Sequence, residues 1–231
     1  MNSWMRALTS SIGMKIVMAV SGAGLVLFVF VHMLGNLELF GGPDALNEYG
    51  ARLRTFPPLL WIARLGLLVL VVAHILSGAR LAILNRAARP VGYARRKNVV
   101  TGWAARTMIW TGLVIGVFVV FHILHFTVRS LKPEYRDMED VMGRHDVFGM
   151  VTDAFRARPV AAAYVGVMLF LGLHASHGFA SMFQTLGVSH PRYHDGIRKL
   201  GPIFAALLVL GFVSVPLAVL LGLVRPDSGG F

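Results

Sequence analysis

The 231-residue sequence contains no cysteine and few charged residues, and both shortages limit what the protein can be. Without cysteine, the chain has no disulfides, no thiolate metal sites and no ligands for an iron–sulfur cluster. Charged residues make up 14% of the sequence, against about 25% in soluble domains. In contrast, 56% of residues are hydrophobic and the mean hydropathy is +0.67. One buried core cannot absorb that excess, so we expect several segments that are surrounded by lipid.

Five apolar stretches are each long enough to cross a bilayer as a helix, which takes about 20 residues. They cover residues 12–37, 59–84, 103–127, 159–183 and 203–224. Because backbone groups in lipid must be hydrogen-bonded within their own segment, we expect helices rather than strands. The predicted fold class is therefore an all-α integral membrane protein. We expect a bundle of five transmembrane helices in one domain, residues 1–231, without an internal repeat.

The connections between these stretches carry two further expectations. Pro202 is expected to open the fifth helix, because proline is favoured in a first helical turn. In the third connection, five residues share a helical spacing that predicts a short helix lying in the membrane interface. They are Val141, His145, Phe148, Thr152 and Phe155.

The basic residues predict how the five spans are oriented. A net charge of +11 would suggest nucleic acid as the partner of a soluble protein, but these basic residues adjoin apolar runs. Residues 80–106 hold seven of the 22 lysines and arginines and no acidic residue. With Arg6, Lys15 and the fourth connection, that side of the membrane carries twelve. By the positive-inside rule we expect a cytoplasmic N-terminus and an external C-terminus.

Histidines are the ionisable residues that these stretches hold at depth. No aspartate, glutamate, lysine or arginine lies at the centre of any stretch. Ionisable residues are costly in lipid and are usually functional there. A single histidine could serve only to hydrogen-bond a neighbouring helix, but four stretches that each carry one point to a shared site. They are His32, His74, His122 with His125, and His174 with His177.

Position along each helix sorts the histidines into two layers. At a rise of about 1.5 Å per residue, His32 and His122 fall in the outer half of the bilayer, and His74 and His174 fall in the inner half. Two imidazoles on facing helices can supply both axial ligands of a haem iron, an arrangement suited to electron transfer. We therefore expect two haem groups, each held by a pair of histidines.

Zinc is the main alternative to haem at these positions. Two histidines on one helix, His122 with His125 or His174 with His177, could chelate a metal ion. Membrane zinc sites usually add a carboxylate, and none lies at that depth in this sequence.

Four segments carry a resemblance to a known family. They are residues 14–54 (MKIVMAVSGAGLVLFVFVHMLGNLELFGGPDALNEYGARLR), 73–97 (AHILSGARLAILNRAARPVGYARRK), 121–126 (FHILHF) and 173–187 (LHASHGFASMFQTLG). On this basis residues 12–225 resemble the dihaem cytochrome b subunit of succinate dehydrogenase and fumarate reductase, the type with one five-helix membrane subunit.

The resemblance implies a subunit of the bacterial cytoplasmic membrane that anchors a flavoprotein and an iron–sulfur protein on its cytoplasmic face. It implies two haem b groups and electron transfer with a membrane quinone, menaquinone or ubiquinone, as a part of the tricarboxylic acid cycle. Succinate or fumarate chemistry would belong to the flavoprotein, so this chain would hold no dicarboxylate site.

The resemblance also assigns the ligands, pairing His32 with His122 at the outer haem and His74 with His174 at the inner haem. In one respect the chain departs from the family. Some fumarate reductases of this type carry a glutamate, linked to proton movement, two residues before the fourth ligand, where this chain has Gly172.

Other polar residues are candidates to contact a haem propionate or a quinone. They are His125, His177, Arg64, Arg80, Arg106, Arg129, Tyr49 and Asn47. Each has an ordinary alternative role: helix packing for the histidines, contact with lipid head groups for the arginines, and loop structure for Tyr49 and Asn47. Glycines on the ligand faces, Gly35, Gly78 and Gly178, are expected to leave room for a macrocycle.

Two alternative functions stay open on the sequence. One is a haem-free polytopic membrane protein such as a transporter, in which the histidines serve packing or proton relay. The other is the cytochrome b anchor of another respiratory complex, such as a hydrogenase or a formate dehydrogenase.

Overall fold

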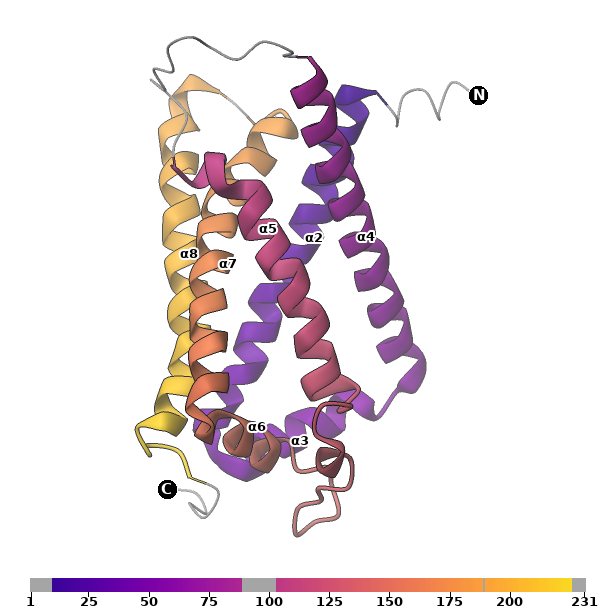
Figure 1. The fold of residues 1–231 in the computed structure, drawn as a ribbon, viewed down its shortest axis with the longest axis vertical. Helices are drawn as coiled ribbons and strands as arrows, with labels where there is room; N and C mark the ends of the chain where they lie inside the picture. The colour runs from indigo at the N-terminus through magenta and orange to yellow at the C-terminus, as the bar shows by residue number, and fades with distance from the viewer. Residues whose placement is uncertain (1–9, 89–102, 189, 226–231) are drawn as a thin grey trace.

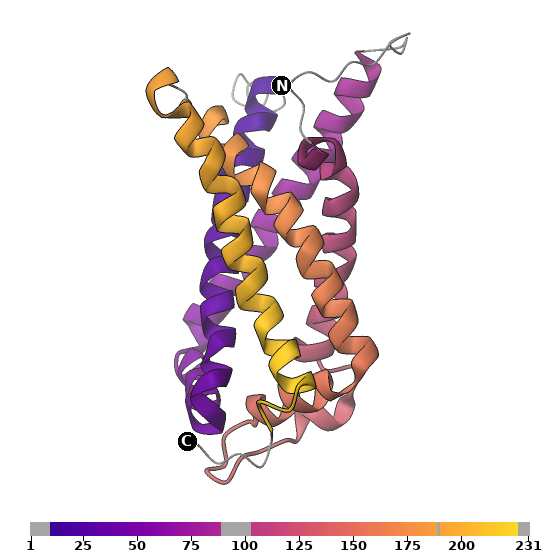
Figure 2. The same cartoon turned by 90° about the vertical axis from the view of Figure 1, so that its left-hand side faces the viewer.

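The structure, a computed structural model, describes residues 10–88, 103–188 and 190–225. Five long helices run along the molecule, as Figures 1 and 2 show. They are α2 (Ser11–Leu37), α4 (Pro57–Ala87), α5 (Trp103–His122), α7 (Arg158–Thr185) and α8 (Pro191–Leu220). All five are long and apolar enough to cross a membrane, which confirms the all-α, five-span expectation.

Large apolar side chains on the outer faces of the helices are exposed, which suits a bundle whose solvent is lipid. The extreme case is α4, in which the most hydropathic 18-residue window contains no buried residue. Helix α4 packs mainly against α2, whereas α7 contacts α2, α5 and α8. The centre of the bundle is therefore bounded by α2, α4, α5 and α7, and α8 covers the side formed by α7 and α2.

The last helix begins earlier than the sequence predicted. It starts at Pro191, so Pro202 lies inside it instead of opening it. Pro191 takes the first-turn role that we had given to Pro202, because a proline there loses no hydrogen bond. Next to Pro202, Gly201 lies directly against the main-chain carbonyl of Ser176, so α8 approaches α7 closely at this point.

Two short helices cross the same end of the bundle, where α2, α5 and α8 end (Figure 1). Helix α3 (Gly42–Arg54) follows α2 after the 3-10 turn η1 (Glu38–Gly41), and α6 (Val147–Arg156) precedes α7. Helix α3 corrects the expectation that Asn47 and Tyr49 lie in a loop. The π-helical turn η2 (Ile123–Thr127) and the 3-10 turn η3 (Pro133–Arg136) complete this end.

The expected interfacial helix is shorter than its spacing suggested. It begins at Val147, so Val141 and His145 precede it, and Val141 is fully exposed. A turn competes with the helix here because the Asp140 side chain accepts hydrogen bonds from the main-chain N–H groups of Met142 and Arg144, both at 2.9 Å. Such local bonds to an aspartate favour turns over helix interiors.

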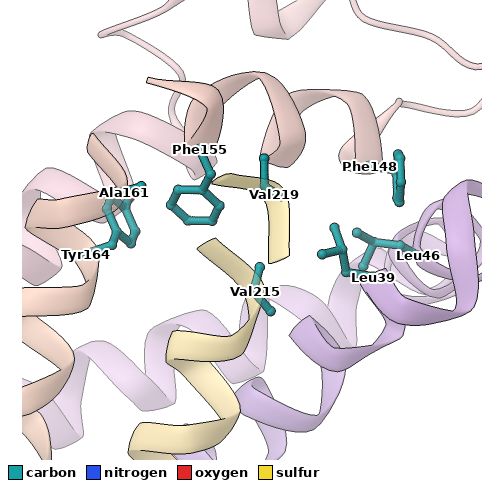
Figure 3. Close-up of a cluster of buried hydrophobic side chains, with 8 residues drawn as sticks. All are labelled: Leu39, Leu46, Phe148, Phe155, Ala161, Tyr164, Val215 and Val219. Atoms are coloured by element: carbon teal, nitrogen blue, oxygen red, sulfur yellow. The ribbon is translucent and has the colours of Figure 1, made fainter. Parts of the chain in front are cut away.

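The largest cluster of buried apolar side chains lies at this same end. We call this end the outer cap, after the side of the membrane that the sequence predicts for it, and define it as η1, α3, η2, η3, α6 and the residues between η3 and α6. Figure 3 shows how side chains from several elements meet there. Apolar residues of η1 and α3 face α6, and the first turns of α7 and the last turns of α8 complete the cluster. The members are Leu39, Leu46, Phe148, Phe155, Ala161, Tyr164, Val215 and Val219. The cap thus holds four long helices at one end by apolar packing.

A buried asparagine joins the two short helices. The Asn47 side chain is 1% exposed and donates to Asp140 at 3.2 Å and to Asp146 at 3.0 Å. Its carbonyl oxygen accepts from the main-chain N–H of Phe148 at 2.9 Å. Nearby, the Arg144 guanidinium forms ion pairs with Asp140, Glu48 and Asp44. Asn47, in the middle of α3, therefore provides a hydrogen-bond partner for a main-chain N–H in the first turn of α6.

Replacing this asparagine should loosen the outer cap. Asn47→Ala leaves the buried N–H of Phe148 without its partner, which costs about 1–3 kcal/mol. We expect a loss of that size in the unfolding free energy of the purified chain, measured by denaturant titration in mixed micelles. Arg52→Ala is the matched control on α3, since it removes an exposed ion pair with Glu48, and such surface pairs contribute little to stability. Equal losses for the two variants would contradict this account of the cap.

Candidate functional site

The structure brings the four histidines together in two pairs across the bundle. The rings of His32 on α2 and His122 on α5 have centroids 5.8 Å apart and planes at 81°. The rings of His74 on α4 and His174 on α7 have centroids 6.3 Å apart and planes at 66°. These are the pairs that helix depth predicted from the sequence. Their role as ligands stays a prediction.

The spacing within each pair suits two axial ligands of one iron. A metal–imidazole bond is about 2.0–2.1 Å long, so two imidazoles on opposite sides of a metal have ring centres roughly 6 Å apart. The observed centroid separations of 5.8 and 6.3 Å fall at that value. The donor set fits as well, because neutral imidazoles are common haem ligands and two of them fill both axial positions.

A buried hydroxyl from another helix lies within hydrogen-bonding distance of each ring of the inner pair. Ser21 Oγ lies 3.3 Å from His74 Nδ1, and Thr111 Oγ1 lies 3.0 Å from His174 Nδ1. Both hydroxyl residues are 1–3% exposed. We had not predicted either residue, because serine and threonine are ordinary in membrane helices. The available signal was a glycine directly after each of them, at the depth of the inner histidines.

Two glycines that we had not predicted make room for the rings of the inner pair. A Cβ on Gly22 would lie 3.3 Å from the His74 ring, and one on Gly112 would lie 3.3 Å from the His174 ring. Of the glycines expected to leave room for a macrocycle, Gly35 packs against Tyr49, whose hydroxyl would lie 2.6 Å from a Cβ built on that glycine. Close packing of α3 on α2 therefore explains Gly35. A Cβ on Gly178 would meet open space, and one on Gly78 would lie 3.9 Å from Met18 Sδ, so the expectation stays a prediction at these two positions.

The outer pair has aromatic surroundings. Phe28 stacks on His32 with ring centroids 5.4 Å apart, and Phe118 lies 5.8 Å from His122. The hydroxyl of Tyr164 lies 3.4 Å from His122 Nδ1 and 3.1 Å from His125 Nδ1. A single buried phenol thus bridges two histidines, which links His125 to the outer pair without placing it opposite another histidine ring. Tyr164 escaped the sequence analysis because it lies far from both histidines in the chain.

Other candidates from the sequence have surroundings of their own. The ring of His177 contacts Ser181 on its own helix at 3.1 Å. Arg64 lies over the ring of Trp61 on the exposed face of α4, 5.2 Å from its centroid. Arg80 and Arg106 are exposed, as expected of side chains that reach lipid head groups.

Three basic side chains, those of Arg54, Arg129 and His145, lie close enough to interact at the end of the bundle that holds the outer cap. Arg129 follows His122 by seven residues, and it has a left-handed backbone with φ 58°. Within the described residues, Arg129 Nε and His145 Nε2 are the buried side-chain nitrogens without a hydrogen-bond partner. Burial lowers the pKa of His145, and the charges of Arg129 and Arg54 lower it further. The unsatisfied N–H of Arg129 and its positive charge make this a place where a carboxylate would be stabilised.

The zinc alternative lacks ligands in this arrangement. Across the described ranges, no three side chains of the histidine, cysteine, aspartate or glutamate types come together as a metal site. Protein zinc sites use three or four such ligands. Pairs of histidines suit instead a metal whose other ligands come from a macrocycle.

Comparison with known proteins identifies no matching family model, no matching curated protein and no matching solved structure. The geometry of the two histidine pairs and the resemblance in the sequence are therefore what bear on function.

The charges around His145 predict an acid-sensitive outer cap. Because the folded chain depresses the pKa of His145, the unfolded chain binds a proton more readily, and stability should fall as pH drops through about 6.5. We expect unfolding free energy in mixed micelles to decline between pH 7.5 and 5.5, and His145→Gln to flatten that decline. Stability that rises with acidification would mean that an anionic group already balances these charges.

Proposed function

We propose that this chain is the dihaem cytochrome b membrane subunit of a succinate:quinone oxidoreductase, which carries electrons between an iron–sulfur protein and membrane quinone. One observation carries the proposal. Four histidines from four different helices form two pairs, and each pair has the separation of two imidazoles that share one metal. A general helix-packing role would not require that separation twice.

Haem in such a site would supply a one-electron carrier whose iron is closed to other ligands. His32 and His122 would hold the outer group, and His74 with His174 the inner one. The surrounding apolar helices exclude water from the rings, and the buried hydroxyls and aromatic rings fix how the imidazoles are turned. Arg129 would offer a buried N–H group and a positive charge to a propionate.

The assignment to succinate or fumarate chemistry rests on the resemblance of residues 14–54 and 73–97 to the family. The chain itself would then act without a dicarboxylate site, and its catalytic partner would be the flavoprotein. A cytochrome b anchor of another respiratory complex would use the same pairs, so the identity of the copurifying subunits distinguishes the two.

The proposed orientation places the outer cap on the external side of a bacterial cytoplasmic membrane. The N-terminus and the connections after α4 and α7 would then face the cytoplasm, as the basic residues favour. The inner histidine pair would lie nearer to that side, where the iron–sulfur protein would dock. Electrons would have a short path from the docked clusters to the inner group and then to the outer group.

Haem content tests the proposal directly. Pyridine haemochrome analysis of the purified complex should give about two haem b groups per chain. Removal of one axial imidazole should release the group from the bundle, so His74→Ala and His174→Ala should each lose the same inner haem. The outer haem should be lost in both His32→Ala and His122→Ala.

The neighbouring histidines serve as matched controls. His125→Ala and His177→Ala should keep both haems, because neither ring lies opposite another histidine. Low-temperature optical spectra with redox titration identify which haem is lost in each variant. A wild-type content near zero would refute the proposal. Loss of the same haem from His32→Ala and His74→Ala would refute the pairing.

A third test concerns the partners and the orientation together. Affinity purification of the chain from its native membrane should recover a flavoprotein and an iron–sulfur protein. Cross-linking from a cysteine at Arg192 or Lys199 should capture the iron–sulfur protein, whereas a cysteine at Asp44 in the outer cap should not. Capture from Asp44 alone would reverse the proposed orientation, and recovery of neither protein would contradict the proposed complex.

A further inference from the structure

Helices α2 and α5 carry the same pattern of site residues at the same intervals. Each has a hydroxyl residue, a glycine, a phenylalanine and a histidine, and the histidine follows the hydroxyl residue by eleven positions. These residues are Ser21, Gly22, Phe28 and His32 in α2, and Thr111, Gly112, Phe118 and His122 in α5. We had expected no internal repeat, because the lipid-facing residues between these positions differ and hide the match.

The helices that follow them also correspond. His74 in α4 and His174 in α7 are each followed after four residues by a glycine, Gly78 and Gly178. A short helix precedes each of them, α3 in the first half and α6 in the second. The chain from α2 to α7 therefore reads as two copies of a unit made of a long helix, a short helix and a second long helix.

The contacts repeat with the sequence. In the first unit the hydroxyl of Ser21 touches Nδ1 of His74, and in the second the hydroxyl of Thr111 touches Nδ1 of His174. In both units, a Cβ built on the glycine after the hydroxyl residue would lie 3.3 Å from Cε1 of the ring that the hydroxyl touches. Each unit thus builds a support for its own inner histidine, and each histidine pair forms between the two units.

The direction of these hydrogen bonds follows from where the hydroxyl protons go. Ser21 donates its proton to the carbonyl of Val17 at 2.7 Å, and the Thr111 hydroxyl lies 3.1 Å from the carbonyls of Thr107 and Met108. With its proton used in this way, each hydroxyl oxygen accepts from the imidazole, so Nδ1 carries the ring proton. Each ring also donates a hydrogen bond to a main-chain carbonyl, that of Met18 for His74 and that of Met108 for His174.

We infer that Ser21 and Thr111 are equivalent positioning residues that hold His74 and His174 in the tautomer with Nδ1 protonated and the Nε2 lone pair available to a metal. The inference rests on the proposed function in that the metal is a haem iron. A hydrogen bond accepted from the distal N–H fixes the orientation of a ligating imidazole and raises its basicity. Both ligands of the inner haem would receive this support, whereas the outer pair has one tyrosine contact, at His122.

The inference is tested by removing the acceptors and following each haem separately. A more basic imidazole stabilises ferric iron, so loss of the acceptor should raise the midpoint potential of the inner haem. We expect Ser21→Ala and Thr111→Val each to shift that potential upward, and the double variant to shift it by about the sum, because the two hydroxyls support opposite ligands. The outer haem should keep its potential. Redox titration of the purified complex, with both haems resolved optically, gives the shifts.

Two controls separate hydrogen bonding from packing. Thr111→Ser keeps the hydroxyl and should retain the wild-type potential. Ser77→Ala removes a buried hydroxyl on α4 that bonds the His74 carbonyl at 3.1 Å rather than its ring, and it should shift neither haem. If Thr111→Val loses the inner haem, then retention by Thr111→Ser supports the inference, whereas loss in both variants overturns it. An unchanged inner potential in the double variant also overturns it.

Failure of this inference is distinguishable from failure of the proposed function. A wild-type complex without haem would refute the proposed function. The tautomer would then be read from 15N-histidine spectra of the full chain in lipid. His74 and His174 should show a protonated Nδ1, and Ser21→Ala and Thr111→Val should lower the population of that tautomer. A protonated Nε2 at these rings in the wild-type chain would overturn the inference by itself.

Discussion

An imidazole in the middle of a bilayer has no water to bond, so its nitrogens must find partners within the protein. This constraint organises the bundle. Helices α2 and α5 supply a hydroxyl to each inner histidine, while the four bundle helices bring the rings together in pairs. The small residues beside the rings follow from the same need, since a side chain at Gly22 or Gly112 would press on the imidazole that the hydroxyl holds.

The sequence predicted the elements that hydropathy controls and the residues that depth controls. The five spans follow from apolar length alone, and the histidine pairs follow from where each histidine falls along its helix. Segments outside the lipid were harder to predict, because competing local hydrogen bonds decide them. Helix α3 contains charged and polar residues without a long apolar run. The hydrogen bonds to Asp140 form a turn where the spacing predicted a helix, so α6 begins only at Val147. Proline position misled us at α8, where Pro191 and Pro202 were both possible starts.

The supporting residues of the site could not be predicted for a different reason. Ser21, Thr111 and Tyr164 matter through contacts made between helices, and 39 or more residues separate them from the histidines they touch. Arg129 was a candidate from the sequence, but its unsatisfied nitrogen, like that of His145, is visible only once the outer cap has folded. A sequence pattern could reveal Ser21 and Thr111 only through the repeat, in which a hydroxyl residue and a glycine twice precede a histidine at the same interval.

The repeat explains why the pairs form where they do, and α8 explains why the two units are no longer equivalent. If two like units pack with their helices in the same direction, equivalent histidines meet across the axis between them, which gives His32 with His122 and His74 with His174. Helix α8 packs on α7 and α2, and α4 is left with the most lipid-exposed surface.

At the outer level, the position in α4 that corresponds to Tyr164 in α7 is Arg64, so a phenol beside one ring is matched by a charge on the lipid side. The inner level has kept its hydroxyl and glycine in both units. Symmetry is thus preserved at the inner histidines and lost at the outer ones, and two otherwise equivalent histidine pairs acquire different electrostatic surroundings.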